Sequence, residues 1–354
     1  MILSLSFGIK GDRRMPDTWV LGIETSCDET SAAVVGDGRV IASSVISSQI
    51  AVHRRFGGVV PEVASRQHLD RITFVVDEAL KEAGLGFSSI SCLAVTVGPG
   101  LIGALLVGVA AAKAYSYALK IPLVPVHHLE AHLYANFLAH PELEPPFVCL
   151  VVSGGHTSLI LLQDHLKYRL LGATRDDAAG EAFDKIARVL GLPYPGGPAL
   201  EELAAAGDPC AIPFPRAWLE EGSTDFSFSG LKTAVINYLN RLREEGTSPY
   251  LPDVAASFQA AIVDVLVEKA LLAAKKAGVG KVALAGGVAS NSTLRRHFEK
   301  RAAEEGLDFY FPEKRLCTDN AAMVACAGYY HYLAGHRASL SQEAFAHYPL
   351  VPCE

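Results

Sequence analysis

The sequence predicts an α/β protein built from two lobes, and three observations carry this expectation. Strand-like apolar runs alternate with helix-length amphipathic runs throughout the chain. Its 354 residues are more than twice the roughly 150 that serve as a prior for one domain. Residues 147–162 repeat the strand, polar turn and strand pattern of residues 20–35, with a Thr-Ser pair opening the second strand each time. Two lobes that begin alike would place both polar turns in a shared cleft.

The first half of the chain contains the elements of one lobe in order. The run at 101–119 reaches membrane length, but it is mostly Ala, Gly and Val and carries Lys113, so we expect a buried helix. Residues 1–17 are interpreted as a loose extension. Three prolines within residues 141–146 indicate a linker, since proline is excluded from helix interiors and central strands. The expected strands are 19–23, 32–35, 40–44 and 92–97, and a further expected helix is 67–82.

The composition excludes several classes of protein. Lys and Arg total 31 against 38 Asp and Glu, a net charge of -7, and half of the residues are apolar. This balance excludes a disordered chain and a protein that binds polyanions over its whole surface. The seven cysteines are an odd number and never form a C-x-x-C pair, which argues against a disulfide framework and favours a reducing cytosol. They are Cys27, Cys92, Cys149, Cys210, Cys317, Cys326 and Cys353.

A pair of histidines opens a predicted helix after the strand at 123–126. His128 and His132 are four residues apart, so they lie about 40° from each other on one helix face, as in a two-histidine metal clamp. An ordinary pair of histidines remains an equal alternative. Asp319 is the candidate third ligand, although it could equally be a helix N-cap. Two histidines and one carboxylate suit Fe(II), with Zn(II) as a substitute.

A third strand, turn and helix pattern spans residues 281–298. Gly286 and Gly287 end its strand and Asn291 begins its helix, so backbone N–H groups there could bind a phosphate or ribose oxygen. Asp184 could bond ribose hydroxyls or pair with Lys185 or Arg188 on the surface.

The first polar turn, TSCDET, carries two adjacent carboxylates. Asp28 and Glu29 could act as a general base, or they could be solvated turn residues.

Ten motifs taken together resemble the bacterial tRNA threonylcarbamoyladenosine transferase family, TsaD, whose members were formerly called glycoproteases. They run in order from about Trp19 to the C-terminus: GIETSCDET, GGVVPEVASRQH, GPGLIGALLVG, HHLEAH, VSGGHT, DDAAGEAFDK, YPGGP, DFSFSGLKT, AGGVASN and CTDNAAM. The resemblance implies a two-lobed actin/Hsp70/sugar-kinase-like (ASKHA) fold with a ligand cleft between the lobes. The implied lobes are 19–140 with 325–354, and 147–324, with residues 1–18 outside the resemblance.

The resemblance also implies an activity. The family transfers the threonylcarbamoyl group from threonylcarbamoyl-AMP to the exocyclic amine of the adenosine 3′ of the anticodon, in tRNAs reading ANN codons, and releases AMP. Because this substrate is already an activated anhydride, positioning and electrostatic stabilisation suffice and no cysteine nucleophile is needed. Cys27 is therefore expected to be a bystander, while Asp28 or Glu29 would accept the proton of the attacking amine.

Site residues follow from the resemblance motif by motif. His128, His132 and Asp319 match the metal ligands, which would hold one Fe(2+) per subunit with Zn(2+) as a possible substitute. Positions that hold the adenylate or an adenine nucleotide match Val151, Val152, Ser153, Gly154, Gly155, Asp184, Gly197, Glu201 and Asn291. Only some members use the acidic residue at the position of Glu201.

The implied partners are tRNA, a paralogous two-lobed protein (TsaB) and a small ATPase (TsaE), in the cytoplasm and without a membrane. An acidic chain that binds tRNA needs a local basic patch. The densest cationic stretch near the first turn comprises His53, Arg54, Arg55, Arg66 and Arg71. These residues are predicted to contact phosphates, with ordinary solvated charges as the alternative.

Three other classes of protein remain in view. A chaperone-like ATPase of the same fold or a sugar kinase would need the nucleotide turns but not the paired histidines. A zinc peptidase would need a glutamate directly after the first histidine, whereas Glu130 lies two residues on, about 200° round the helix from His128.

Overall fold

The computed structural model describes residues 2–6 and 15–350, and the chain forms two compact units, which are described separately. Unit 1 comprises Met1–Glu144 and Pro312–Cys353, and unit 2 comprises Pro145–Phe311. The first boundary lies inside the proline-rich segment. The chain returns to unit 1 at Pro312, earlier than residue 325, which the family resemblance implied. Helix α10 (Lys314–Cys317) explains the difference, because it packs against α4 (His128–Ala139) in unit 1.

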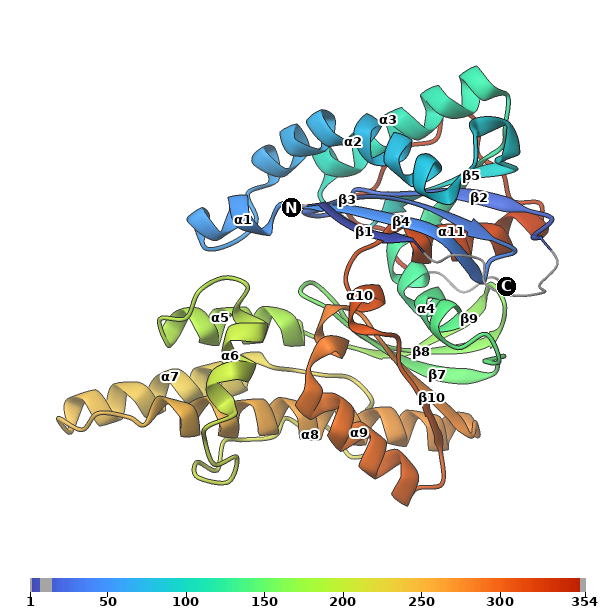
Figure 1. Cartoon of the computed structure of the whole chain (residues 1–354). Coiled ribbons are helices and arrows are strands. Elements are labelled where there is room, and N and C mark those ends of the chain that lie inside the picture. Colours follow the sequence, from blue (N-terminus) through green and yellow to red (C-terminus); the bar gives the residue numbers. More distant parts are fainter. Residues whose placement is uncertain (1, 7–14, 351–354) are drawn as a thin grey trace. The chain divides into compact units, whose positions relative to one another are not determined.

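Unit 1 is built on a six-stranded sheet with β2 near its centre. On one side of β2, strand β3 pairs antiparallel with β2, and β4 pairs antiparallel with β3. On the other side, β5 pairs parallel with β2, and β6 pairs parallel with β5. Helices α2 and α3 cover one face of this sheet, and α4 and α11 cover the other (Figure 1). The strands are β1 (Ile2–Ser6), β2 (Trp19–Glu24), β3 (Glu29–Gly36), β4 (Val40–Ser48), β5 (Cys92–Gly98) and β6 (Leu123–His127), and the other helices are α2 (Pro61–Ala83), α3 (Ile102–Leu119) and α11 (Ala321–Leu333).

Two local features explain how the layers of unit 1 pack. All six residues of β2 are buried, as expected for a strand with helices on both faces. A Cβ atom at Gly22 would lie 2.3 Å from the carbonyl oxygen of Ala321, so only glycine lets α11 approach the strand this closely. The side chains of Leu21 and Ile23 belong to the hydrophobic core with residues of α2 and α3.

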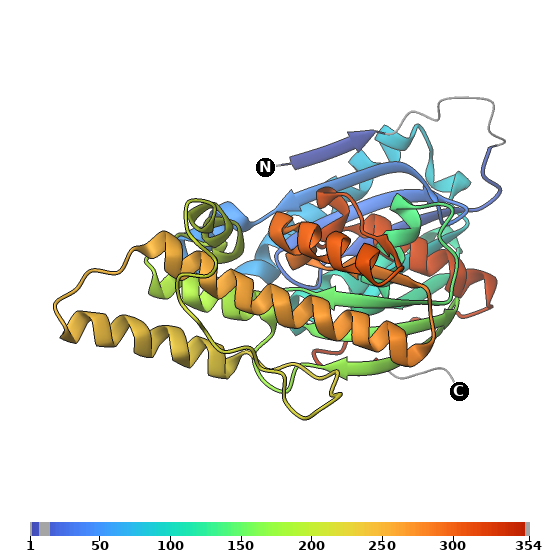
Figure 2. The same cartoon turned by 90° about the horizontal axis from the view of Figure 1, so that it is seen from below.

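Unit 2 repeats this architecture. On one side of the central strand β7, β8 pairs antiparallel with β7, and β9 pairs antiparallel with β8. On the other side, β10 pairs parallel with β7, and β11 pairs parallel with β10. The long helix α8 contacts β7, β8 and β10, and Figure 2 shows the helices of this unit from below. The strands are β7 (Phe147–Val152), β8 (Thr157–Asp164), β9 (Lys167–Ala173), β10 (Lys281–Ala285) and β11 (Asp308–Tyr310), and the helices are α5 (Ala179–Val189), α6 (Gly196–Ala204), α7 (Ser229–Glu244), α8 (Leu251–Ala277) and α9 (Ser292–Glu304). The similarity of the two hairpins seen in the sequence therefore reflects a repeated sheet.

Two expectations about unit 1 need correction. Residues 2–6 were expected in a loose extension, but they form the edge strand β1, antiparallel to β4. A short apolar run can add to a sheet edge through backbone hydrogen bonds alone, which leave no periodic signal in five residues. Helix α3 is long and apolar enough to span a membrane by length and composition. Only one of its faces is buried, against β5 and α2, while Ile102, Leu106 and Tyr117 are exposed.

Candidate metal and nucleotide sites

The two histidines of unit 1 are fixed at the start of a buried helix. Strand β6 ends at His127, whose Nδ1 accepts a hydrogen bond from the backbone N–H of Leu129 at 3.1 Å and so caps α4. His128 and His132 follow on the first two turns, both buried, with ring centroids 4.7 Å apart. The helical spacing therefore brings the two rings together, as predicted.

Asp319 completes a group of three potential ligands. Its Oδ1 lies 3.5 Å from Nε2 of His128 and 3.3 Å from Nε2 of His132. One ligand atom from each residue lies within 4.8 Å of the other two. The alternative role as a helix N-cap is wrong, because Asn320 caps α11 by accepting a hydrogen bond from the N–H of Met323.

The donor set fits a metal ion on its own chemistry. Within the described part of the chain, neither ring nitrogen of His132 makes a hydrogen bond of good geometry, although the ring is fully buried. A buried polar group without a partner is costly, and a metal that accepts the imidazole lone pair removes part of this cost. Two imidazole nitrogens and one carboxylate suit Fe(II) or Zn(II) better than Mg²⁺ or Ca²⁺.

The electrostatics of the group favour a positive charge. Burial alone would lower the pKa of His128, but the carboxylates of Asp319 and Glu24 raise it to about 9. Burial lowers the pKa of His132. One of the two rings is thus surrounded by acidic groups that favour a cation, whether a proton or a metal ion.

The acidic turn of unit 1 lies within electrostatic reach of the same aspartate. Burial, followed by the charge of Asp319, raises the pKa of Asp28. Burial and the neighbouring Asp28 raise the pKa of Glu29 to about 8. The Oε1 atom of Glu29 accepts a hydrogen bond from Ser48 Oγ at 2.9 Å, while its Oε2 is buried without a partner within the described residues. Asp28 and Glu29 are therefore half-buried carboxyls with raised pKa values.

Cys27 lies in the same turn but carries no reactive thiolate. Burial and the charge of Asp28 raise the pKa of its thiol well above the ordinary value. Thiol reactivity requires the thiolate. The six cysteines in the described part of the chain are all free, and Cys353 lies outside it.

Two further residues support this site and were missed in the sequence. Glu24, the last residue of β2, bonds Thr96 Oγ1 at 2.7 Å and lies 3.1 Å from Nδ1 of His128. The imidazole of His68 forms two hydrogen bonds, from Nε2 to the carbonyl oxygen of Cys27 at 3.0 Å and between Nδ1 and Thr30 Oγ1 at 2.8 Å. The signals were a carboxylate that ends an apolar strand and a histidine within the buried stripe of α2.

In unit 2, glycines let three backbone segments meet at one edge of the sheet. Strands β7 and β10 are parallel, so their carboxyl ends lie side by side. Gly286 follows β10 with φ +90°, and a Cβ there would lie 2.4 Å from the carbonyl oxygen of Val152. At Gly180, near the start of α5, a Cβ would lie 2.5 Å from the carbonyl oxygen of Ser153. Val151 and Val152 are buried strand residues, whereas Gly154 and Gly155 are exposed in the turn after β7.

Three of the polar side chains expected at this edge hold a helix start, whereas Ser153 Oγ accepts from the N–H of His156 in the turn after β7. Asp184 Oδ1 accepts from the N–H of Gly196 at 2.8 Å, directly before Gly197 in α6. Asn291 Oδ1 caps α9 by accepting from the N–H of Leu294 at 2.8 Å. Glu201 Oε1 accepts from the N–H of Ser292 at 2.7 Å. These bonds bring α5, α6 and α9 together.

Of the two bases expected beside Asp184, Arg188 acts on it, since its positive charge favours the ionised carboxyl. Lys185 pairs instead with Asp177 and Glu181, both at 2.8 Å. Asp184 itself is half-buried, and burial raises the pKa of its carboxyl.

The predicted cationic stretch is only partly exposed. Arg54, Arg55 and Arg71 are exposed, and Arg66 is exposed while pairing with Glu62 at 2.7 Å. His53 was wrongly assigned to this surface. It is buried, and its Nε2 lies 3.1 Å from Gln49 Oε1, since α1 (Ile50–His53) turns the imidazole inward.

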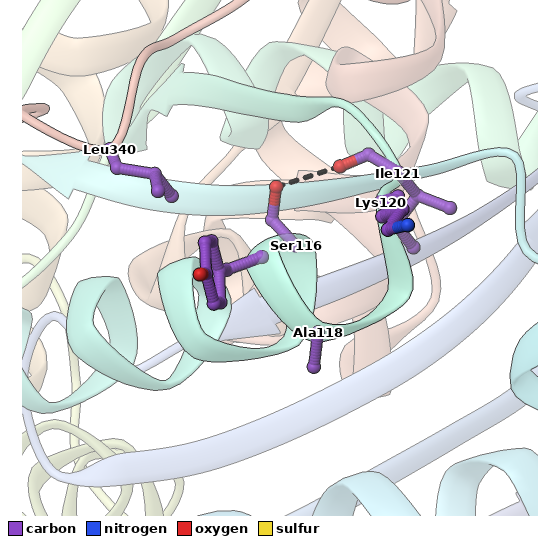
Figure 3. Close-up of a pocket in the computed structure, with 6 residues that line it drawn as sticks. Ser116, Ala118, Lys120, Ile121 and Leu340 are labelled. Carbon is purple, nitrogen blue, oxygen red and sulfur yellow. Dashed lines mark hydrogen bonds between the residues drawn. The ribbon is translucent and has the colours of Figure 1, made fainter.

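An open surface depression at the C-terminal end of α3 holds none of these residues. Ser116 Oγ donates to the carbonyl of Ile121 at 2.7 Å beside it (Figure 3). The depression is lined by Ser116, Tyr117, Ala118, Lys120, Ile121 and Leu340. It offers no cluster of groups suited to catalysis.

The repeated sheets and the histidine and aspartate group define the class of the protein: a two-lobed α/β protein of the ASKHA type that carries a candidate metal centre. Solved structures share this fold, among them full-length HypF (TM-score 0.59, 15% identity, covering 94% of this chain and 57% of that one). Component A of (R)-2-hydroxyglutaryl-CoA dehydratase from Acidaminococcus fermentans is also similar (TM-score 0.52, 16% identity, covering 88% of this chain and 98% of that one).

The chain belongs to the TsaD family, tRNA N6-adenosine threonylcarbamoyltransferase, whose family pattern matches residues 40–326. A relative of this name from Moorella thermoacetica is 62% identical over 334 residues, which cover 94% of this chain and 98% of the relative. One from Clostridium kluyveri is 55% identical over 329 residues, covering 93% and 96%. The protein is therefore an enzyme that modifies tRNA, an acyltransferase of the threonylcarbamoyl type.

Proposed function

We propose that the chain transfers the threonylcarbamoyl group from threonylcarbamoyl-AMP to the exocyclic amine of the adenosine 3′ of the anticodon in tRNAs reading ANN codons, and releases AMP. The observation that carries this proposal is the buried group of His128, His132 and Asp319 beside an acidic turn. The amine nitrogen attacks the carbamoyl carbon, the bond from this carbon to the phosphate oxygen breaks, and AMP leaves with the electron pair.

His128, His132 and Asp319 would hold the metal, proposed as one Fe(2+) per subunit with Zn(2+) as a substitute. Such an ion supplies Lewis acidity and orientation for an oxygen of the substrate when it is bound. Asp28 or Glu29 would accept the proton that the attacking amine loses. Burial raises the pKa of both carboxyls, which brings each closer to the operating pH of a general base.

The edge of unit 2 formed by the turns after β7 and β10 would hold the adenylate or an adenine nucleotide. The glycines allow close approach of the phosphate, and the start of α9 offers an electropositive helix N-terminus. Side chains at this edge already cap helices, so we propose that they act by holding the backbone around the ligand, and Asp184 would use its second oxygen for ribose. The proposed set is Val151, Val152, Ser153, Gly154, Gly155, Asp184, Gly197, Glu201 and Asn291.

Arg54, Arg55, Arg66 and Arg71 would bind tRNA phosphates. Charge reversal at Arg54 and Arg55 should weaken tRNA binding and reduce the salt dependence of log Kd by about one for each phosphate that is no longer neutralised. Unchanged affinity with an unchanged salt slope would place the tRNA elsewhere.

The proposed partners are a paralogous two-lobed protein, TsaB, and a small ATPase, TsaE, in the cytoplasm and without a membrane. Exposed apolar side chains on α2 and α3, two helices that pack together, favour this face for TsaB. They are Leu69, Phe74, Ile102, Leu106 and Tyr117. Leu106→Asp should abolish a complex with TsaB in size-exclusion chromatography with light scattering, while Lys120→Asp, just after the same helix, should retain it.

The direct test of the activity supplies threonylcarbamoyl-AMP and an unmodified tRNA for an ANN codon to the chain with TsaB and TsaE. Mass spectrometry of the digested tRNA should detect threonylcarbamoyladenosine, and His128→Ala with His132→Ala should abolish it. Absence of product with the unaltered chain would overturn the proposed reaction. Full transfer by the doubly substituted chain would overturn the role of the metal group alone.

A further inference from the structure

Glu24 places a carboxylate against the outer nitrogen of a metal-ligand histidine. The residue ends β2 and its side chain is fully buried. Its Oε2 accepts from Thr96 Oγ1 at 2.7 Å and lies 3.1 Å from Nδ1 of His128. Its Oε1 accepts from the backbone N–H of Ser26 at 2.5 Å. Three segments of unit 1, β2, β5 and α4, therefore meet on one side chain.

The sheet explains why this carboxylate lies there. Strands β2 and β5 are parallel, with Ile23 opposite Val95, so the next residues, Glu24 and Thr96, lie side by side at the carboxyl end of the sheet. A buried carboxylate is costly unless hydrogen bonds compensate it. Here the carboxylate accepts hydrogen bonds from three donors, namely a hydroxyl, a backbone N–H and an imidazole N–H. These bonds give it one well-defined orientation.

The chemistry of the pair fixes the state of the histidine. An ionised carboxylate only accepts hydrogen bonds, so Nδ1 of His128 must carry the hydrogen. The other nitrogen, Nε2, faces Asp319 at 3.5 Å and is the one that can bind a metal ion, which displaces the proton that Nε2 carries in the metal-free protein. Carboxylates in this position are known to orient metal-ligating histidines and to raise their basicity.

We propose that Glu24 is the positioning residue of the metal centre, holding His128 as the Nδ1–H tautomer so that Nε2 is available as a ligand. This inference rests on the proposed role of His128, His132 and Asp319. The same carboxylate holds the N–H of Ser26, two residues before Asp28, so it also fixes the start of the acidic turn. One side chain thus contacts both a candidate metal ligand, His128, and the backbone at the start of the acidic turn.

Ser26 offers a competing explanation. Its Oγ lies 3.2 Å from the same Nδ1 and could orient the ring in place of Glu24. The carboxylate is the closer and the charged acceptor, and hydrogen bonds to charged groups are roughly twice as strong as neutral ones. Ser26→Ala is therefore the matched control, because it removes the weaker acceptor and leaves the carboxylate.

The test measures metal binding rather than turnover. Metal-free full-length chain and its Glu24→Gln, Glu24→Asp and Ser26→Ala variants are titrated with Co²⁺ against a chelator, and the visible absorption of bound Co²⁺ is recorded. Glu24→Gln should weaken Co²⁺ binding by about 10–100-fold and alter the spectrum. Glu24→Asp should recover part of this loss, and Ser26→Ala should stay within a few-fold of the unaltered chain.

Each outcome separates this inference from the proposed function. If the unaltered chain binds no Co²⁺, the metal centre itself is wrong and the role of Glu24 falls with it. If the unaltered chain binds Co²⁺ and folded Glu24→Gln binds it equally well with the same spectrum, only the role of Glu24 is refuted. Circular dichroism verifies folding of the metal-free variants. Should Glu24→Gln fail to fold, Thr96→Val, which removes one bond to the carboxylate, must still weaken Co²⁺ binding, and unchanged binding would refute the role.

Discussion

Replacing Glu29 with glutamine should stabilise the metal-free protein, and increasingly so as the pH rises. Burial and the neighbouring Asp28 raise the pKa of this carboxyl to about 8, from 4.5 as an ordinary glutamate, and its Oε2 is buried without a hydrogen-bond partner in the described residues. Glutamine has nearly the same shape and never ionises. The variant therefore removes an unfavourable ionisation and leaves the packing in place.

The sign and size follow from proton linkage. Below pH 4.5 the glutamate is protonated in both states, so it contributes no pH dependence. Between pH 4.5 and about 8 the folded state keeps a proton that the unfolded state has lost, so stability falls as the pH rises. At about 1.4 kcal/mol for each pKa unit, the total loss is at most roughly 5 kcal/mol above pH 8 and roughly 3 kcal/mol at pH 7. The free energy of unfolding of Glu29→Gln should not contain this loss, because glutamine does not ionise.

The assay is urea unfolding of metal-free protein from pH 5 to pH 9. The chain has two tryptophans, Trp19 in unit 1 and Trp218 in unit 2. A Trp218→Phe background therefore lets the fluorescence of Trp19 report on the unit that contains Glu29. Glu62→Gln, at an exposed residue of α2, is the control, and because it keeps Glu29 its stability should follow that of the parent protein across the pH range. A stability difference for Glu29→Gln that stays constant across the pH range would refute the reasoning.

Three further predictions concern packing and chemistry. Gly286→Ala should cost unit 2 several kcal/mol in urea unfolding, because its Cβ would clash with the carbonyl of Val152, whereas Gly287→Ala, with no protein atom near its Cβ, should leave the stability unchanged. Lys269→Met should cost about 1–3 kcal/mol by leaving the carbonyls of Trp218 and Asp225 without their donor, and unchanged stability would contradict this. Cys27→Ser should keep full transfer activity, and a large loss would make the thiol a participant.

Local patterns predicted most of the elements and the proximity of the two candidate ligands His128 and His132. The alternation of apolar runs placed most strands within a few residues, and the four-residue spacing of His128 and His132 held because helix geometry alone determines it. The same reasoning could not decide between a ligand and an N-cap for Asp319. That choice depended on Asn320, whose side chain takes the cap.

What the sequence could not predict depends on partners that are distant along the chain. His53 lies in a cationic run, but its burial is set by Gln49 and by the backbone of Val60. The edge strand β1 is defined by backbone bonds to β4, more than 30 residues away, which no side-chain pattern encodes. Exposure and edge pairing are properties of the assembled sheet.

The same argument explains why Glu24 escaped notice while His128 did not. In the sequence Glu24 is one carboxylate at the end of the strand that leads into TSCDET, 104 residues from the histidine that it contacts. Only the parallel pairing of β2 with β5 places it beside Thr96, and only α4 after β6 delivers the imidazole to it. Ligands that share a helix are visible as a spacing, whereas the residues that orient them come from other strands and become visible only in the fold. A sequence can therefore point to candidate metal ligands and still omit the carboxylate that contacts one of them.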